Sequence, residues 1–297
     1  MPMIQATLRT LSMQSVRVLS HEASTSSLFL HKRAAILAMR TKERTMSSTS
    51  DDVVHVTRPS PHVALITLRN HPVNALSSRM VTQLEEALAS IESSSGSDHD
   101  AARCVVLASG LDRVFCAGAD LKERAGMSQS ETRDFVTRLR RLTARISSLP
   151  QVSIAAIHGH ALGGGLELAL SCDVRVAMPD ARMALPEVQL GIIPGAGGTS
   201  RLKALIGDSR AKMMICTGRR MTGRDAFRLG VVDELATSHD EEEEDHDDDA
   251  DREDRDQDNG NGKEKMMRCA FRLAEEIARN APLALRAAKV PTLSFFA

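Results

Sequence analysis

The segment Ser153–Thr199 constrains the fold of this chain most, because it joins an apolar run to a helical pattern through three consecutive glycines. Ser153–Ile157 is short, apolar and bounded by proline and glycine, which predicts a buried strand. The letters LELALS after Gly163–Gly165 follow a helical pattern. A glycine turn between strand and helix leaves bare amides at the helix N-terminus, where developing negative charge is favoured.

Two glutamates stand in apolar surroundings near this turn. Glu167 lies in the first turn of the predicted helix, and Glu187 follows in ALPEVQLGIIPGAGG. Two such acids beside free amides suit proton transfer next to an oxyanion. Simpler interpretations stay open at this point. The glycine run is also compatible with a plain tight turn, Glu167 with a favourable charge at a helix start, and Glu187 with a helix that begins after Pro186.

A second segment, Val114–Arg124, adds specificity to this pattern. It reads VFCAGADLKER and follows Arg103–Ala108, a β-branched strand candidate. Gly118 again frees the backbone, so the Ala119 amide is a second candidate donor to a ligand. Common alternatives fail, because the chain contains no G-x-G-x-x-G, no G-x-x-x-x-G-K-[ST] and no G-x-S-x-G pattern.

Three separated segments carry a family resemblance: FCAGADLKER, AAIHGHALGGGLELALSCDVRVA and LPEVQLGIIPGAGGTSRL. In this order and spacing they resemble the signature segments of the crotonase, or enoyl-CoA hydratase/isomerase, family. The match covers roughly Val53–Leu235. The segment AGADLKERAGMS most resembles the mitochondrial methylglutaconyl-CoA hydratase branch of the family. The resemblance implies a spiral of ββα turns, and the alternation of predicted strands and helices independently favours an α/β fold.

The resemblance also implies roles for four residues at the reacting carbons. The backbone amides of Ala119 and Gly164 would hold the thioester oxygen, as an oxyanion hole. Glu167 and Glu187 match the two glutamates that handle water in the hydratases: one activates water for attack on Cβ, and the other delivers a proton to Cα. Family members with a single glutamate are typically isomerases, so the presence of both acids favours hydration.

Binding of the acyl-CoA substrate is expected to involve further positions near these segments. By resemblance they are Ala75, Asp120, Leu121, Lys122 and Gly163, with Lys122 as a candidate for the coenzyme A phosphates. Coenzyme A is part of the substrate here, so no separate cofactor and no metal is expected. The five cysteines are scattered without a C-x-x-C pair, which fits a reducing compartment and argues against a zinc site.

Composition along the chain predicts four regions. Residues 1–50 are basic, rich in serine and poor in acids, as in a mitochondrial transit peptide or a disordered extension, and this favours the mitochondrial matrix. Residues 51–236 form the crotonase core, and 237–262 an acidic linker that is expected to be disordered. Residues 263–297 form part of a C-terminal helical region. It is apparently truncated, since about fifty residues of family helices are absent.

The remaining predictions concern partners. A homotrimer or hexamer is expected if the terminal helices exist, and no apolar run reaches the ~20 residues of a membrane span. RNA binding is disfavoured, because the helix after Ser77 presents Glu85, Glu86 and Glu92 rather than lysines. The arginines of the helix that starts near Ser128, such as Arg138 and Arg145, are expected on a solvated face.

The leading hypothesis is therefore hydration of a short or branched-chain enoyl-CoA, with 3-methylglutaconyl-CoA as one candidate, in fatty-acid or branched-chain amino-acid breakdown. The alternatives are an enoyl-CoA isomerase, and an inactive or RNA-associated binding protein of the same fold.

Overall fold

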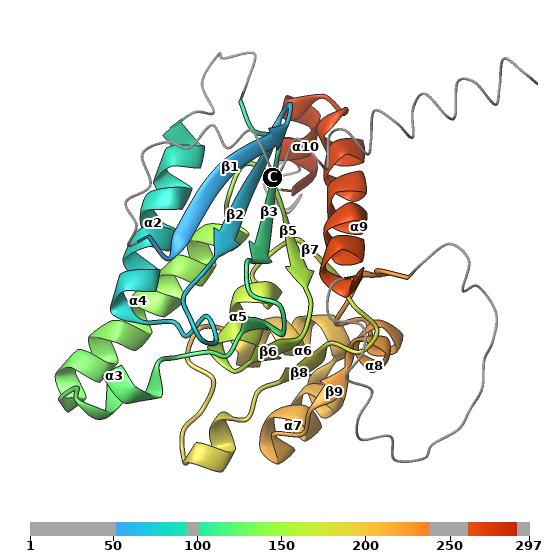
Figure 1. The fold of residues 1–297 in the computed structure, drawn as a ribbon. Coiled ribbons are helices and arrows are strands. Elements are labelled where there is room, and N and C mark those ends of the chain that lie inside the picture. Colours follow the sequence, from blue (N-terminus) through green and yellow to red (C-terminus); the bar gives the residue numbers. More distant parts are fainter. Residues whose placement is uncertain (1–51, 94–100, 238–260, 290–297) are drawn as a thin grey trace, which may run out of the picture. The chain divides into compact units, whose positions relative to one another are not determined.

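The computed structural model describes residues 52–93, 101–237 and 261–289, all of them within the unit Ser47–Ala297 (Figure 1). The predicted transit peptide and most of the predicted acidic linker lie outside the described residues. Its larger sheet has the strand order β1-β2-β3-β5-β7-β10. Its strands are β1 (Val54–Ser60), β2 (Val63–Leu68), β3 (Cys104–Ser109), β5 (Val152–Ile157), β7 (Val174–Ala177) and β10 (Glu234–Leu235). Only β1 runs antiparallel to its neighbour.

A second sheet of short strands has the order β4-β6-β8-β9. Its members are β4 (Val114–Cys116), β6 (His160–Leu162), β8 (Arg182–Ala184) and β9 (Met221–Thr222). Each long strand β3, β5 and β7 is followed by a short strand of this second sheet and then by helical structure. This order is the repeated ββα turn that the sequence predicts.

The helices are α2 (Ser78–Ser93), α3 (Leu121–Ala125), α4 (Gln129–Ser147), α5 (Gly164–Leu170), η1 (Glu187–Leu190), α6 (Gly198–Ile206), α7 (Asp208–Thr217), α8 (Gly223–Leu229), α9 (Asn261–Ala278) and α10 (Pro282–Lys289). The helix predicted to start near Ser128 does so, because Ser128 caps α4 in a reciprocal capping box. Thr222 caps α8 in the same way. Strands β1 and β2 form an antiparallel hairpin in which residues 58–60 belong to β1.

Side-chain alternation in the parallel strands builds two cores. In β3, Val105 and Leu107 face the core shared with α2, α4 and α5, whereas Val106 and Ala108 face the other side. There α9 covers the sheet (Figure 1) with Met266 and with three small residues that let it approach closely, namely Ala270, Ala274 and Ala278. Both faces of the sheet are therefore buried, as parallel sheets require.

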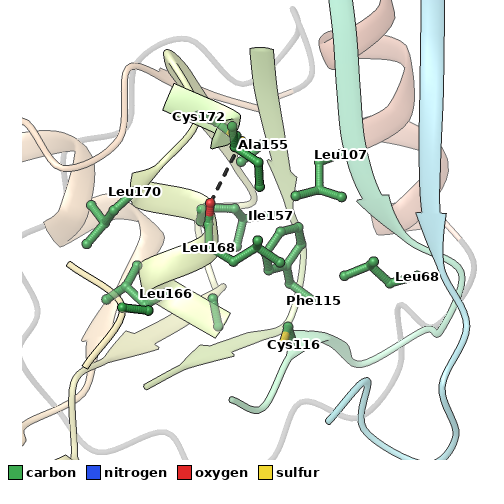
Figure 2. Close-up of a cluster of buried hydrophobic side chains, with 14 of the residues drawn as sticks. Leu68, Leu107, Phe115, Cys116, Ala155, Ile157, Leu166, Leu168, Leu170 and Cys172 are labelled. Carbon is green, nitrogen blue, oxygen red and sulfur yellow. Dashed lines mark hydrogen bonds between the residues drawn. The ribbon is translucent and has the colours of Figure 1, made fainter. Parts of the chain in front are cut away.

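The first core reaches the base of the glycine turn. Phe115 of β4 is fully buried and lies between Leu107 of β3 and Leu168 of α5 (Figure 2). Leu166 and Ile157 belong to the same cluster. Because the chain has no Trp or Tyr, this packing is almost entirely aliphatic. The helix that carries Glu167 is thus fixed by close contact with β4 and β6.

The expectation of a solvated arginine face on α4 is correct for its other arginines, which are exposed, but not for Arg138 and Arg145. Each of these two pairs with an acid of α2: Arg138 with Glu85 and Arg145 with Glu92, both at 2.6 Å. The Arg138 guanidinium is bidentate on the Glu85 carboxylate. The two helices are therefore joined by charge as well as by apolar contact, which no single helical pattern reveals.

We expect Gly165→Ala to lower the free energy of unfolding by about 1–3 kcal/mol, because overpacking of this order follows when a methyl group has no room. A Cβ atom at Gly165 would lie 2.0 Å from the Cys116 carbonyl oxygen, which belongs to the backbone and cannot rotate away. Gly126→Ala is the matched control, since the nearest atom to its Cβ lies at 3.6 Å. Urea denaturation of both variants measures the difference, and equal stabilities would contradict the close approach.

Candidate active site

The turn that carries Ala119 is held by an isolated parallel bridge to Leu76. Leu76 N donates to Gly118 O at 2.8 Å, and Asp120 N donates to Leu76 O at 3.3 Å. In a parallel bridge the residue between these two partners directs its own amide to the opposite side. The Ala119 amide therefore points away from Leu76.

The second turn precedes α5. Gly163 has φ +52°, in a region that favours glycine, and its amide donates to Ala184 O at 2.9 Å. Helix α5 then begins at Gly164, whose amide has no carbonyl one turn earlier to accept its proton. The sequence thus places a bare amide at the start of a buried helix.

The two turns meet, as the space around their glycines shows. A Cβ atom placed at Gly164 would lie 3.6 Å from Ala119 N and 3.1 Å from Leu76 Cδ1. A Cβ atom at Gly118 would lie 3.1 Å from Gly164 N. The amides of Ala119 and Gly164 therefore lie close together, with the Leu76 side chain packed beside Gly164.

Glu167 is held from the opposite side by a third turn. The carboxyl is 3 % exposed, and Oε1 accepts hydrogen bonds from Ala196 N and Gly198 N, both at 2.8 Å. Burial raises the pKa of Glu167, and the amides of Gly198 and Ala196 act in the opposite direction. The two amides favour the ionised form in a site that otherwise disfavours it.

Glu187 is the first residue of η1 and is 8 % exposed. Its Oε1 would lie 3.0 Å from a Cβ at Gly163, so the carboxyl sits against the first turn of the site. Within the part of the chain that the structure describes, its Oε2 is buried without a hydrogen-bond partner. Burial raises the pKa of Glu187 to about 7, with a further rise from the charge of Glu167.

The remaining predicted positions surround the Ala119 turn. Ala75 follows β2 in the loop that ends at Leu76, and its carbonyl accepts from Asn70 Nδ2 at 2.8 Å. Asp120 caps α3, since its Oδ1 accepts from Lys122 N at 3.0 Å and from the next amide at 3.2 Å. Leu121 is 56 % exposed and Lys122 is also exposed. Their contact with a substrate stays a prediction.

Asn74 is a positioning residue that sequence reasoning treated only as part of a turn. It is fully buried with φ +51°, and its Nδ2 donates to Ser109 Oγ at 2.8 Å and to Phe115 O at 3.0 Å. Its Oδ1 accepts from Asn70 N at 2.8 Å. These bonds fix the loop that leads into Leu76. An asparagine in a turn, HPVNAL, is the local signal for the unusual backbone.

None of the helices within residues 52–93, 101–237 and 261–289 combines the length and the apolar character needed to cross a membrane. The site combines an α/β scaffold, two neighbouring backbone amides and two buried carboxyls. The sequence profile of the family described as Enoyl-CoA hydratase/isomerase matches residues 59–247. The chain belongs to this enoyl-CoA hydratase/isomerase, or crotonase, family.

Individual relatives agree with this assignment. The chain is 41 % identical over 239 residues to the putative enoyl-CoA hydratase/isomerase YngF of Bacillus subtilis, covering 80 % of each protein. It is 45 % identical over 188 residues to the mitochondrial methylglutaconyl-CoA hydratase 1 of Pyricularia oryzae, covering 63 % of this chain and 53 % of that protein. The crystal structure of an enoyl-CoA hydratase from Bacillus anthracis superposes with a TM-score of 0.68 at 38 % identity, covering 80 % of this chain and 81 % of that one. The predicted crotonase-like fold is confirmed.

We expect Glu187→Gln to be stabilising at alkaline pH. A carboxyl with pKa about 7 in the folded protein and 4.5 otherwise costs no stability below pH 4.5, and the cost grows until the pH passes 7. The gain from removing this charge is therefore about 2 kcal/mol larger at pH 8 than at pH 5. Urea denaturation at both pH values tests this, with Glu86→Gln, at an exposed position on α2, as the control. A gain independent of pH would contradict the buried environment of Glu187.

Proposed function

We propose that this chain is an enoyl-CoA hydratase, which adds water across the 2,3 double bond of a short or branched-chain enoyl-CoA. The observation that carries the proposal is the pair of buried acids Glu167 and Glu187, with the charge of Glu167 raising the pKa of Glu187, beside the neighbouring amides of Ala119 and Gly164. A site with one carboxyl would suffice for moving a proton between two carbons. Addition of water requires a proton to be taken from one atom while another is delivered elsewhere.

The amides of Ala119 and Gly164 would bind the thioester carbonyl oxygen. When water attacks Cβ, negative charge moves through the conjugated system onto this oxygen. Donors that already point at the developing charge in a water-poor site stabilise it without reorganising, and the loss of one such donor costs about 3 kcal/mol. This stabilisation of the oxyanion lowers the activation barrier, whichever carboxyl moves the proton.

The two carboxyls would divide the proton transfers according to their surroundings. Glu167 accepts two amide hydrogen bonds on Oε1, which stabilise its anion, so it takes the proton of the attacking water. Glu187 has a buried, unpartnered oxygen and a pKa of about 7, so near neutrality it holds a proton to give to Cα. One new O–C bond and one new C–H bond then form, and the proton lost by Glu187 is balanced by that gained by Glu167.

The substrate's coenzyme A portion would lie along Ala75, Asp120, Leu121 and Lys122, with Gly163 at the acyl end. The exposed position of Lys122 supports a contact with phosphate, since an ammonium group needs no fixed geometry for that role. Coenzyme A arrives as part of the substrate, so the proposal requires no separate cofactor and no metal.

A 3-methylglutaconyl substrate and the mitochondrial matrix are the finer parts of the proposal. Similarity to a fungal protein named mitochondrial methylglutaconyl-CoA hydratase supports both, and the basic composition of residues 1–50 supports the second. A homotrimer or hexamer is proposed on the family resemblance alone. Enoyl-CoA isomerisation is the second candidate function, because a single carboxyl beside the same amides can carry one proton between carbons.

We expect Glu167→Gln and Glu187→Gln each to lower hydration of crotonyl-CoA by about 10²–10⁴-fold, the usual contribution of a positioned acid or base. The loss of the double-bond absorbance in the full-length protein measures the rate, and 3-methylglutaconyl-CoA is assayed in parallel. Glu86→Gln is again the control. Isomerisation would be indicated instead if Glu167→Gln kept full activity on a 3-enoyl-CoA and Glu187→Gln lost it.

We also expect hydration to slow at alkaline pH. Because Glu187 must be protonated to deliver a proton to Cα, kcat/KM for the enoyl-CoA falls about tenfold per pH unit above its pKa of about 7. Hydration releases no net proton, so its equilibrium constant does not change with pH, and kcat/KM for dehydration of the 3-hydroxyacyl-CoA falls in parallel. Initial rates between pH 6 and 9 measure the fall, and a kcat/KM for hydration that stays constant up to pH 9 would refute the assigned role of Glu187.

A further inference from the structure

The turn at residues 195–198 holds Glu167, and it has no side-chain anchor of its own. It consists of three glycines and one alanine, and Gly197 adopts φ +100°. Two of its amides, those of Ala196 and Gly198, donate to Glu167 Oε1. A segment this poor in side chains has many backbone conformations available. Something outside the turn must therefore fix the direction of these amides.

The carbonyl groups of the same turn are held from two other elements. Ala196 O accepts hydrogen bonds from Thr143 Oγ1 of α4 at 2.7 Å and from Arg201 Nη1 of α6 at 2.8 Å. The adjacent carbonyl, Gly195 O, accepts from Arg140 Nε of α4 at 3.2 Å. The Arg201 guanidinium also covers Gly197, where a Cβ would lie 2.3 Å from Nη1. Donors from two helices thus hold the carbonyls whose neighbouring amides hold Glu167.

Thr143 is placed for this contact rather than for solvent. It is 2 % exposed, and besides Ala196 O its hydroxyl bonds only weakly within its own helix, to Arg140 O at 3.1 Å. A buried hydroxyl loses its hydrogen bonds to water, and the bond to Ala196 O replaces them.

We propose that Thr143 and Arg201 are positioning residues for Glu167, and that they act on it through the Ala196 carbonyl. They fix the 195–198 turn so that the Ala196 and Gly198 amides meet Oε1, and they do not touch the reacting atoms. The inference rests on the proposed role of Glu167 as the base. The positive charge of Arg201 adds a second effect in the same direction, since it lowers the pKa of Glu167 against the larger rise caused by burial.

Helix α4 offers a matched control for a threonine hydroxyl. Thr137 Oγ1 also donates to a backbone carbonyl of its own helix, Arg133 O at 2.8 Å, and it lies at an exposed position. Thr137→Val removes only such a bond, whereas Thr143→Val also removes the bond to Ala196 O at almost unchanged volume. Thr143→Ser restores a hydroxyl at the same position.

The kinetic test uses the full chain and crotonyl-CoA. We expect Thr143→Val and Arg201→Gln to lower kcat about tenfold or more with KM within twofold of the original value, because a small misplacement of a reacting group is enough for such a loss. Thr143→Ser should recover most of the rate, and Thr137→Val should keep it. Arg201 lies at a half-buried position, so Arg201→Gln keeps the test decisive if Thr143→Val does not fold. Unchanged kcat in both variants overturns the inference.

Two further readouts separate positioning from a general structural role. The first readout is the double variant. Adding Thr143→Val to Glu167→Gln should lower kcat by less than a further twofold, because the carboxylate that Thr143 positions is already absent. A further loss as large as that of Thr143→Val alone overturns the inference. The second readout is the titration of Glu167, followed in protein whose carboxyl groups are isotopically labelled. Its signal is the one that disappears in Glu167→Gln. We expect this titration to move to higher pH in Thr143→Val and to return to its original pH in Thr143→Ser. An unmoved titration also overturns the inference. This readout needs no turnover, whereas full hydration by Glu167→Gln would refute the proposed function itself.

Discussion

The backbone contact between the Gly118–Ala119 turn and the Gly163–Gly165 turn is the constraint on which the rest of the site depends. A Cβ at Gly118 would lie 2.7 Å from Leu162 O, and one at Gly165 would lie 2.0 Å from Cys116 O. Only chains without side chains at these points can approach so closely. Two parallel strands of the small sheet, β4 and β6, bring the turns together. The aliphatic core below holds them there, so the spacing of the amides is set by packing.

Two acids are buried where the fold alone would prefer apolar groups. Glu167 is compensated by amides, and Glu187 keeps a buried oxygen without a partner in the described part of the chain. The cost of that second acid is offset by a sheet buried on both faces, with α9 packed on one side and α2, α4 and α5 on the other. If Glu187 has the proposed role, stability and function oppose each other at this residue, as is common where a carboxyl must titrate near neutrality.

Local patterns made much of this structure predictable. The buried strand at residues 153–157, the helix that carries Glu167 and the capped starts of α4 and α8 all depend on neighbours in sequence. The strands β4, β6 and β8 have three residues each, too few for any periodicity to appear. The pairs Arg138–Glu85 and Arg145–Glu92 link helices far apart in sequence, so helical pattern alone assigned their charges to solvent. For the same reason, the sequence around Thr143 does not predict its hydrogen bond to Ala196 O.

The same segment serves both acids, which ties their behaviour together. It begins with Glu187 in η1 and ends with Gly198, whose amide holds Glu167. A shift of this segment changes the packing that raises the pKa of Glu187 and the amide bonds that oppose the rise at Glu167. The charge of Glu167 also raises the pKa of Glu187. The position of this one segment therefore affects the surroundings of both carboxyls.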